Sequence, residues 1–160
     1  MSDYGTVSLL DAYLHILGHP VFFFMLGACI GSFMNVVFYR YPLNRSVVSP
    51  GSACPSCKKA IAFYDNIPIL AWIILKGCCR HCHLKISPIY PAVELAFAVC
   101  FTLANCVSQS SLAMSFTIAF LSSSALSVAY LLKKCGRAPW YLWLVACGSF
   151  SYFCFQILVG

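Results

Sequence analysis

The stretch Val21–Tyr39, VFFFMLGACIGSFMNVVFY, contains 19 residues and no charged side chain. A bilayer core about 30 Å thick requires roughly 20 apolar residues of α-helix, so this stretch predicts a membrane span. The whole chain agrees, because 61% of its 160 residues are hydrophobic and only 9% are charged. Soluble domains carry about a quarter charged residues, and disordered chains are poor in apolar ones, so both classes are excluded.

Three further stretches are long and apolar enough to span. Leu112–Leu132 and Trp140–Val159 carry no charge, and Ile89–Val107 carries one ionisable group, Glu94, near its start. The predicted fold is therefore an all-α polytopic membrane protein with about four transmembrane helices. The run Ile67–Leu75 is apolar but too short to span, and we expect it to form a helix in or against the membrane surface.

Basic residues predict the orientation of the chain. Residues 40–88, between the first two spans, contain seven Lys or Arg and one acid, Asp65, and the link 133–139 contains three more basic residues. Loops rich in Lys and Arg stay in the cytoplasm, so both segments are expected there and residues 1–20 outside. Because residues 1–20 contain no Lys or Arg, the first span is expected to be retained rather than cleaved. The net charge of +6 is then a topology signal, and no nucleic-acid partner is expected.

Two cysteine pairs lie in the loop of residues 40–88, called here the zinc-knuckle loop. They are Cys54-Pro-Ser-Cys57 and Cys79-Arg-His-Cys82, separated by residues 58–78. Two such knuckles place four thiolates around one zinc ion, and reduced thiols are typical of the cytoplasm. Four protein ligands leave no open position for water, so the predicted zinc is structural. A 49-residue loop buries little core by itself, and a metal ion compensates for that.

Alternatives to this ligand set remain open. The cysteines could be apolar residues without metal or a redox dithiol, and Cys78, His81 or His83 could replace one of the four ligands. We favour Cys79 over Cys78 because Cys78 would break the spacing of its knuckle. No internal repeat is evident in the sequence.

Three other residues are candidates for function. Asp65, beside Asn66, is expected to cap the helix that follows or to contact a substrate. Gly77 ends the apolar run as a glycine at the C′ position would. Glu94 lies one to two turns into a predicted span, where a carboxylate indicates function or reaches the interface to pair with a basic residue.

The order of these residues resembles a known family. The stretches that carry the resemblance are Gly31-Ser32-Phe33-Met34-Asn35-Val36-Val37, Tyr39-Arg40-Tyr41-Pro42, Cys54-Pro55-Ser56-Cys57, Tyr64-Asp65-Asn66-Ile67-Pro68, Gly77, Cys79-Arg80-His81-Cys82, Ile86-Ser87 and Tyr90-Pro91-Ala92-Val93-Glu94. Together they resemble the amino-terminal half of the bacterial prepilin leader peptidase/N-methyltransferase, continuously from about Gly27 to Glu94.

The resemblance implies a multi-pass protein of the bacterial inner membrane. Members of this family remove the leader of type IV prepilins and type II secretion pseudopilins on the cytoplasmic side. They then methylate the new N-terminus with S-adenosylmethionine. The resemblance links the zinc-knuckle loop, and Gly77 in particular, to methyl transfer, so Gly77, Asp65 and Glu94 become candidate methyl-transfer or substrate-contact residues.

The sequence also departs from the family pattern. No Asp follows Asp65 and no acid of any kind follows Glu94, so both aspartates of the family's aspartic peptidase are absent. That chemistry needs two carboxylates that share a proton, and peptidase activity is not expected from this chain alone. The alternatives are a non-catalytic truncated homologue, or a zinc-stapled membrane scaffold that binds pilus or secretion components. A separate carboxy-terminal peptidase half is a possible partner, besides pilins and membrane lipid.

Overall fold

The computed structural model describes residues 15–108 and 111–159, with side chains described up to residue 155. Most of the predicted extracytoplasmic segment 1–20 therefore lies outside the described residues. The described part is helical, with two isolated β-bridges and no strand. Its elements are the α-helices α2 (Pro20–Arg40), α3 (Leu70–Ile74), α4 (Ile89–Val107), α5 (Leu112–Cys135) and α6 (Trp140–Val159), and the 3-10 helices η1 (Tyr41–Leu43) and η2 (Phe63–Asn66).

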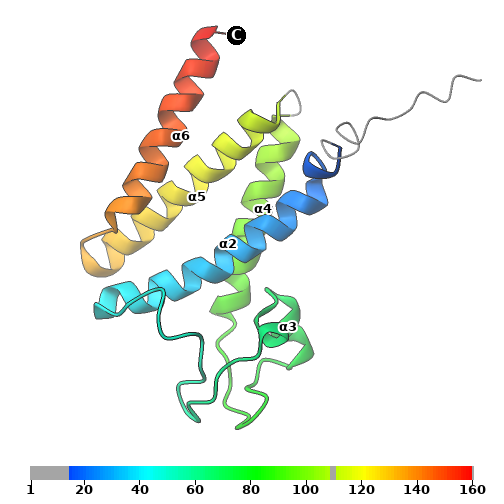
Figure 1. The fold of residues 1–160 in the computed structure, drawn as a ribbon, viewed down its shortest axis with the longest axis vertical. Helices are drawn as coiled ribbons and strands as arrows, with labels where there is room; N and C mark the ends of the chain where they lie inside the picture. The colour runs from blue at the N-terminus through cyan, green and yellow to red at the C-terminus, as the bar shows by residue number, and fades with distance from the viewer. Residues whose placement is uncertain (1–14, 109–110, 160) are drawn as a thin grey trace, which may run out of the picture.

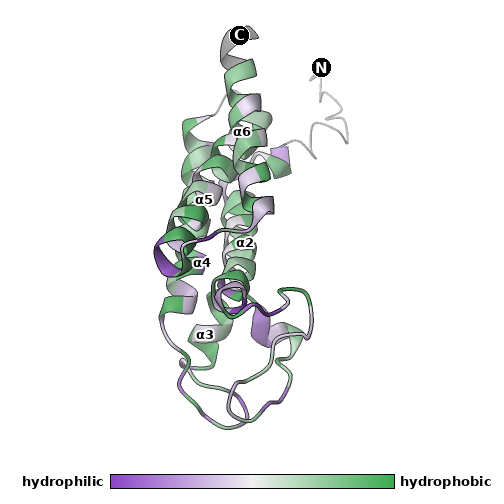
Figure 2. Ribbon diagram, turned by 90° about the vertical axis from the view of Figure 1, so that its left-hand side faces the viewer, coloured by the Kyte–Doolittle hydropathy of each residue, from purple (hydrophilic) through white to green (hydrophobic). Residues whose placement is uncertain are grey.

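The four long helices form one bundle, and the zinc-knuckle loop extends from one end of it (Figure 1). In the bundle α2 packs on α4, α4 on α5, and α5 on α6. Figure 2 shows apolar residues over most of the bundle, while hydrophilic ones gather in the loop and at the helix ends. This distribution suits helices surrounded by lipid, where polar groups are costly.

Two glycines bring α2 and α4 into close contact. A Cβ atom at Gly27 would lie 2.6 Å from the carbonyl oxygen of Phe97, and one at Gly31 would lie 2.8 Å from the Cα atom of Glu94. Small residues allow the backbones of membrane helices to approach in this way. Gly27 and Gly31, four residues apart on α2, thus form a contact face between the two helices.

Among the described residues, three helices are long and apolar enough to cross a membrane: α2 together with η1, then α4 and α5. The described apolar part of α6, Trp140–Phe155, is shorter than a span requires. The all-α membrane fold is confirmed for three candidate spans, and the fourth stays a prediction. Helix α4 has the same limits as the second predicted span, whereas α5 continues to Cys135 beyond the predicted end at Leu132.

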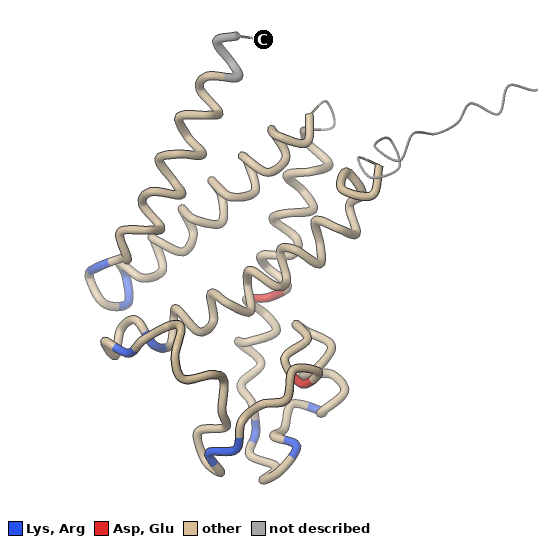
Figure 3. Tube along the Cα trace, viewed as in Figure 1, with Lys and Arg blue, Asp and Glu red and all other residues tan. Residues whose placement is uncertain are grey.

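Basic residues gather toward one end of the molecule, in the zinc-knuckle loop and at the turn between α5 and α6 (Figure 3). The turn is tied to the end of α2, since Lys134 donates from Nζ to the carbonyl of Phe38 at 2.9 Å. Arg137 also donates a hydrogen bond to Asn44 and lies over the ring of Tyr41. The two segments predicted to share one side of the membrane therefore lie close together.

Candidate metal centre and its surroundings

The cysteines of the two knuckles converge on one point. The sulfur atoms of Cys54, Cys57, Cys79 and Cys82 all lie within 4.8 Å of one another. The Sγ atoms of Cys54 and Cys82 are 3.7 Å apart. A tetrahedral zinc ion with Zn–S bonds of about 2.3 Å requires sulfurs roughly 3.8 Å apart, whereas a disulfide holds them at about 2.05 Å. The geometry and the donor atoms both fit a zinc ion.

The two knuckles have the same backbone hydrogen bonds. The carbonyl of Cys54 accepts from the N–H of Lys58 at 3.0 Å, and the carbonyl of Cys79 accepts from His83 at the same distance. Both partner residues have positive φ angles, 58° and 56°. Each knuckle also closes as a short hairpin, with bridges between Ala53 and Ala60 and between Cys78 and Lys85. The loop thus contains two equivalent hairpins.

This equivalence corrects the expectation that the sequence has no internal repeat. Residues 52–61 correspond to residues 77–86, because Ile61 donates to Ser52 at 2.9 Å and Ile86 donates to Gly77 at 2.7 Å. In this alignment Cys79 is the counterpart of Cys54, and Cys78 is the counterpart of Ala53. The repeat therefore explains why Cys79, rather than Cys78, points into the cluster.

Backbone N–H groups surround the sulfurs and favour thiolates at two of them. The N–H groups of Cys57 and Ser56 lower the pKa of Cys54 to about 6. Those of Cys82 and His81 lower the pKa of Cys79 as well. The N–H of Lys59 acts in the same direction on Cys57, but burial and the other thiols raise its pKa to about 11. The thiols that raise the pKa of Cys57 would all become thiolates around a bound zinc ion, because zinc binds the thiolate form of cysteine.

Asp65 does not cap α3. The residue before the first turn of α3 is Ile69, and neither Asp65 nor Asn66 bonds to that turn. Instead both carboxylate oxygens of Asp65 accept from Arg80, one of them from Nε at 2.7 Å. Arg80 lies inside the second knuckle and holds the pKa of Asp65 below its usual range. The bidentate pair therefore ties η2 to the metal centre, a role that the sequence did not reveal.

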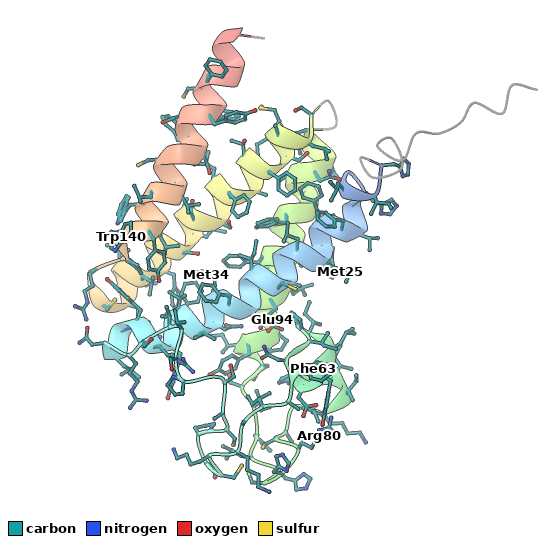
Figure 4. All side chains as sticks on the ribbon, in the orientation of Figure 1. Met25, Met34, Phe63, Arg80, Glu94 and Trp140 are labelled. Carbon is teal, nitrogen blue, oxygen red and sulfur yellow. The ribbon has the colours of Figure 1, made fainter. Side chains whose placement is uncertain are left out.

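Glu94 of α4 takes the place of the missing cap. Its Oε2 atom accepts from the N–H of Ile69 at 2.6 Å, and its side chain is buried. Ile69 has φ 62° and ψ −54°, and the N–H of Leu70 bonds to the carbonyl of Pro68 at 2.6 Å. This is a γ-turn with positive φ, which costs a β-branched residue about 1–3 kcal/mol. Glu94 thus holds the strained entry to α3 against a membrane helix, as Figure 4 shows by its place between bundle and loop.

Gly77 follows the end of α3 at the C″ position, one residue beyond the predicted C′ position. Lys76 occupies C′ with φ 51°, and Gly77 follows with φ 68°. The N–H of Gly77 bonds to the carbonyl of Trp72 at 2.8 Å and that of Lys76 to Ile73 at 3.0 Å, which is a Schellman motif. A Cβ at Gly77 would lie 2.9 Å from the indole of Trp72. A cavity of about 390 Å³ borders this contact.

These contacts divide the predicted site residues into two groups. The four cysteines form one cluster, and Asp65 joins it through Arg80. Gly77 and Glu94 lie at the two ends of α3, at the cavity and at the bundle respectively. A zinc ion held by the four cysteines has no free coordination position, so its contribution is to shape the loop.

The comparisons with known proteins agree with this arrangement. The model of the bacterial peptidase A24 N-terminal domain matches residues 25–108. A prepilin leader peptidase/N-methyltransferase of Myxococcus xanthus is 51% identical over 81 residues, which cover 51% of this chain and 24% of the relative. A type 4 prepilin-like proteins leader peptide-processing enzyme of Escherichia coli is 42% identical over 106 residues, which cover 55% of this chain and 39% of the relative.

A third relative is more distant. A prepilin leader peptidase/N-methyltransferase of Bacillus subtilis is 36% identical over 99 residues, which cover 62% of this chain and 40% of the relative. The chain thus matches no more than about two fifths of the length of these three proteins. No solved structure matches the chain. Since the family model covers more than half of its residues, the chain belongs to the family of the bacterial peptidase A24 N-terminal domain, which includes these prepilin leader peptidase relatives.

Proposed function

We propose that this chain works in the processing of type IV prepilins or type II secretion pseudopilins, at the cytoplasmic face of the bacterial inner membrane. The observation that carries the proposal is the four-thiol cluster, which lies inside the segment that matches the family. Two candidate membrane spans, α2 and α4, flank it in that segment, and a third, α5, follows the segment. In this proposal the zinc-knuckle loop is cytoplasmic and receives the amino-terminal end of a pilin.

In this proposal, methyl transfer is the family chemistry that the chain carries out by itself. Bound S-adenosylmethionine supplies a methyl group, which passes from its sulfur to the terminal amine of a cleaved pilin while that amine loses a proton. We place this reaction near Gly77, because Gly77 and Trp72 border the cavity next to the metal centre. Leader cleavage by two aspartates is not part of the proposal, because no Asp follows Asp65 in this chain.

A labelling experiment tests the proposal. The purified chain in lipid nanodiscs is incubated with methyl-labelled S-adenosylmethionine and with either an uncleaved prepilin or the same pilin without its leader. We expect label only on the cleaved pilin and no removal of the leader. Gly77→Ala should lose most of this transfer and keep its zinc, since the added Cβ displaces the Trp72 indole. The matched control is Gly51→Ala in the same loop, where a Cβ meets no atom within 4 Å.

A non-catalytic role is the second candidate, because a zinc ion held by four cysteines has no open coordination position and serves only to shape the loop. In that case the chain binds pilins, or a separate peptidase half, without transferring a methyl group. Pilin binding without label supports this second function and contradicts methyl transfer. Absence of both label and binding contradicts any role in pilin processing and leaves a membrane scaffold.

A further inference from the structure

One face of α3 is exposed in the described part of the chain. Leu70, Ile73 and Ile74 follow helical spacing along this face, and these residues are 56%, 58% and 71% exposed. On the other side Ala71 is buried, and Trp72 packs on Gly77 and donates to the carbonyl of Ile86 at 3.1 Å. Three large aliphatic side chains on a five-residue helix therefore face outward, where water would be an unfavourable surrounding.

This apolar face is held next to a membrane helix. The only side chain bonded to the entry of α3, among the described residues, is Glu94, which belongs to the candidate span α4. Figure 1 shows α3 beside the end of α4 from which the loop extends. A 2.6 Å hydrogen bond therefore holds the entry of α3 against the candidate span α4.

Charges near α3 match the surface of an anionic membrane. Residues 65–94 contain three basic residues, Lys76, Arg80 and Lys85, and two acids, Asp65 and the buried Glu94. Arg80 is neutralised by Asp65, while the described residues include no salt bridge to Lys76 or Lys85. Both lysines border the cavity beside Trp72, just after α3. Lysines that flank an apolar helix reach lipid headgroups while its apolar side chains enter the acyl region.

We propose that α3 is a membrane-inserted element of the zinc-knuckle loop. Leu70, Ile73 and Ile74 enter the acyl-chain region of the same bilayer that surrounds α4, and Lys76 and Lys85 contact anionic headgroups. Glu94 is the positioning residue, because it fixes the turn from which α3 starts. The proposal concerns the lipid surroundings of the loop and stands apart from the proposed function.

Photo-crosslinking in the full chain tests this proposal. Benzoylphenylalanine is placed at Ile74 or, as a matched control, at Leu84, an exposed aliphatic residue of the second knuckle. Each variant is illuminated in nanodiscs of phosphatidylcholine with phosphatidylglycerol, and adducts are identified by mass spectrometry. We expect lipid adducts at Ile74 in several-fold excess over Leu84. Removing one lysine, in Lys76→Gln or Lys85→Gln, should lower the ratio of anionic to neutral lipid adducts about fivefold.

Glu94 is tested in the same assay. Glu94→Ala should lower the yield of lipid adducts at Ile74 several-fold. Asn35→Ala should leave that yield unchanged, because the hydrogen bond that Asn35 donates goes to the carbonyl of Tyr90 on α4. Equal yields at Ile74 and Leu84 would overturn the proposal. So would adducts at Ile74 with a second copy of the chain or an added pilin in place of lipid, since another protein would then cover the face.

Discussion

The helix bundle and the zinc-knuckle loop are stabilised in different ways. In the bundle, large side chains such as Phe23, Phe101 and Leu131 are fully buried, and α2 and α4 touch through glycines. In the loop of residues 40–88, all of which the structure describes, Cys54 and Ala71 are the only buried apolar residues. Packing therefore suffices for the bundle, while the loop depends on its metal centre and on a few polar contacts. Damage to one region should leave much of the other intact.

Loss of a metal ligand should have the largest effect and should be confined to the loop. Cys57→Ser is expected to reduce bound zinc from about one ion per chain to near zero, because structural zinc contributes on the order of 10 kcal/mol to folding. Metal analysis measures the zinc, and hydrogen exchange should show loss of protection in residues 52–61 and 77–86 only. Cys78→Ser is the matched control and should bind zinc as the wild type does, since its thiol lies outside the cluster. Equal zinc loss in both variants would contradict the ligand set.

Damage to helix packing should produce the opposite pattern. In Gly27→Val the new side chain meets the carbonyl of Phe97 and the Cβ of Phe101, both within 3 Å of its first carbon. We expect a loss of about 1–3 kcal/mol in the free energy of unfolding in detergent, with zinc still bound. Gly148→Ala is the control, because a Cβ there meets no atom within 4 Å. A wild-type stability for Gly27→Val would mean that α2 and α4 are not packed closely.

The smallest effect is expected at the contact between η2 and the second knuckle. Asp65→Asn removes the charge that pairs with Arg80 and should speed the release of zinc to a chelator modestly, without preventing its binding. The charge-reversed double variant Asp65→Arg with Arg80→Asp should recover part of the slow zinc release of the wild type. If the double variant releases zinc faster than either single variant, the pair does not support the metal centre.

Much of the candidate site was predictable because its signals are local. The spacing within each CxxC pair and the apolar length of α4 follow from residues that are neighbours in the chain. The role of Asp65 was not predictable, because its partner Arg80 is 15 residues away and side chains compete for such contacts. The structural repeat of the two hairpins was not predictable from the sequence either, since backbone hydrogen bonds form with almost any residue type.

The amino-acid sequence by itself determined that the chain is a helical membrane protein with four thiols at zinc spacing, because hydrophobic length and ligand spacing are properties of short segments. Only the tertiary structure decided what surrounds those thiols. It brought Glu94 to Ile69, paired Asp65 with Arg80 and turned one face of α3 outward. Such contacts join segments that are distant in the sequence, so no short stretch of residues predicts them.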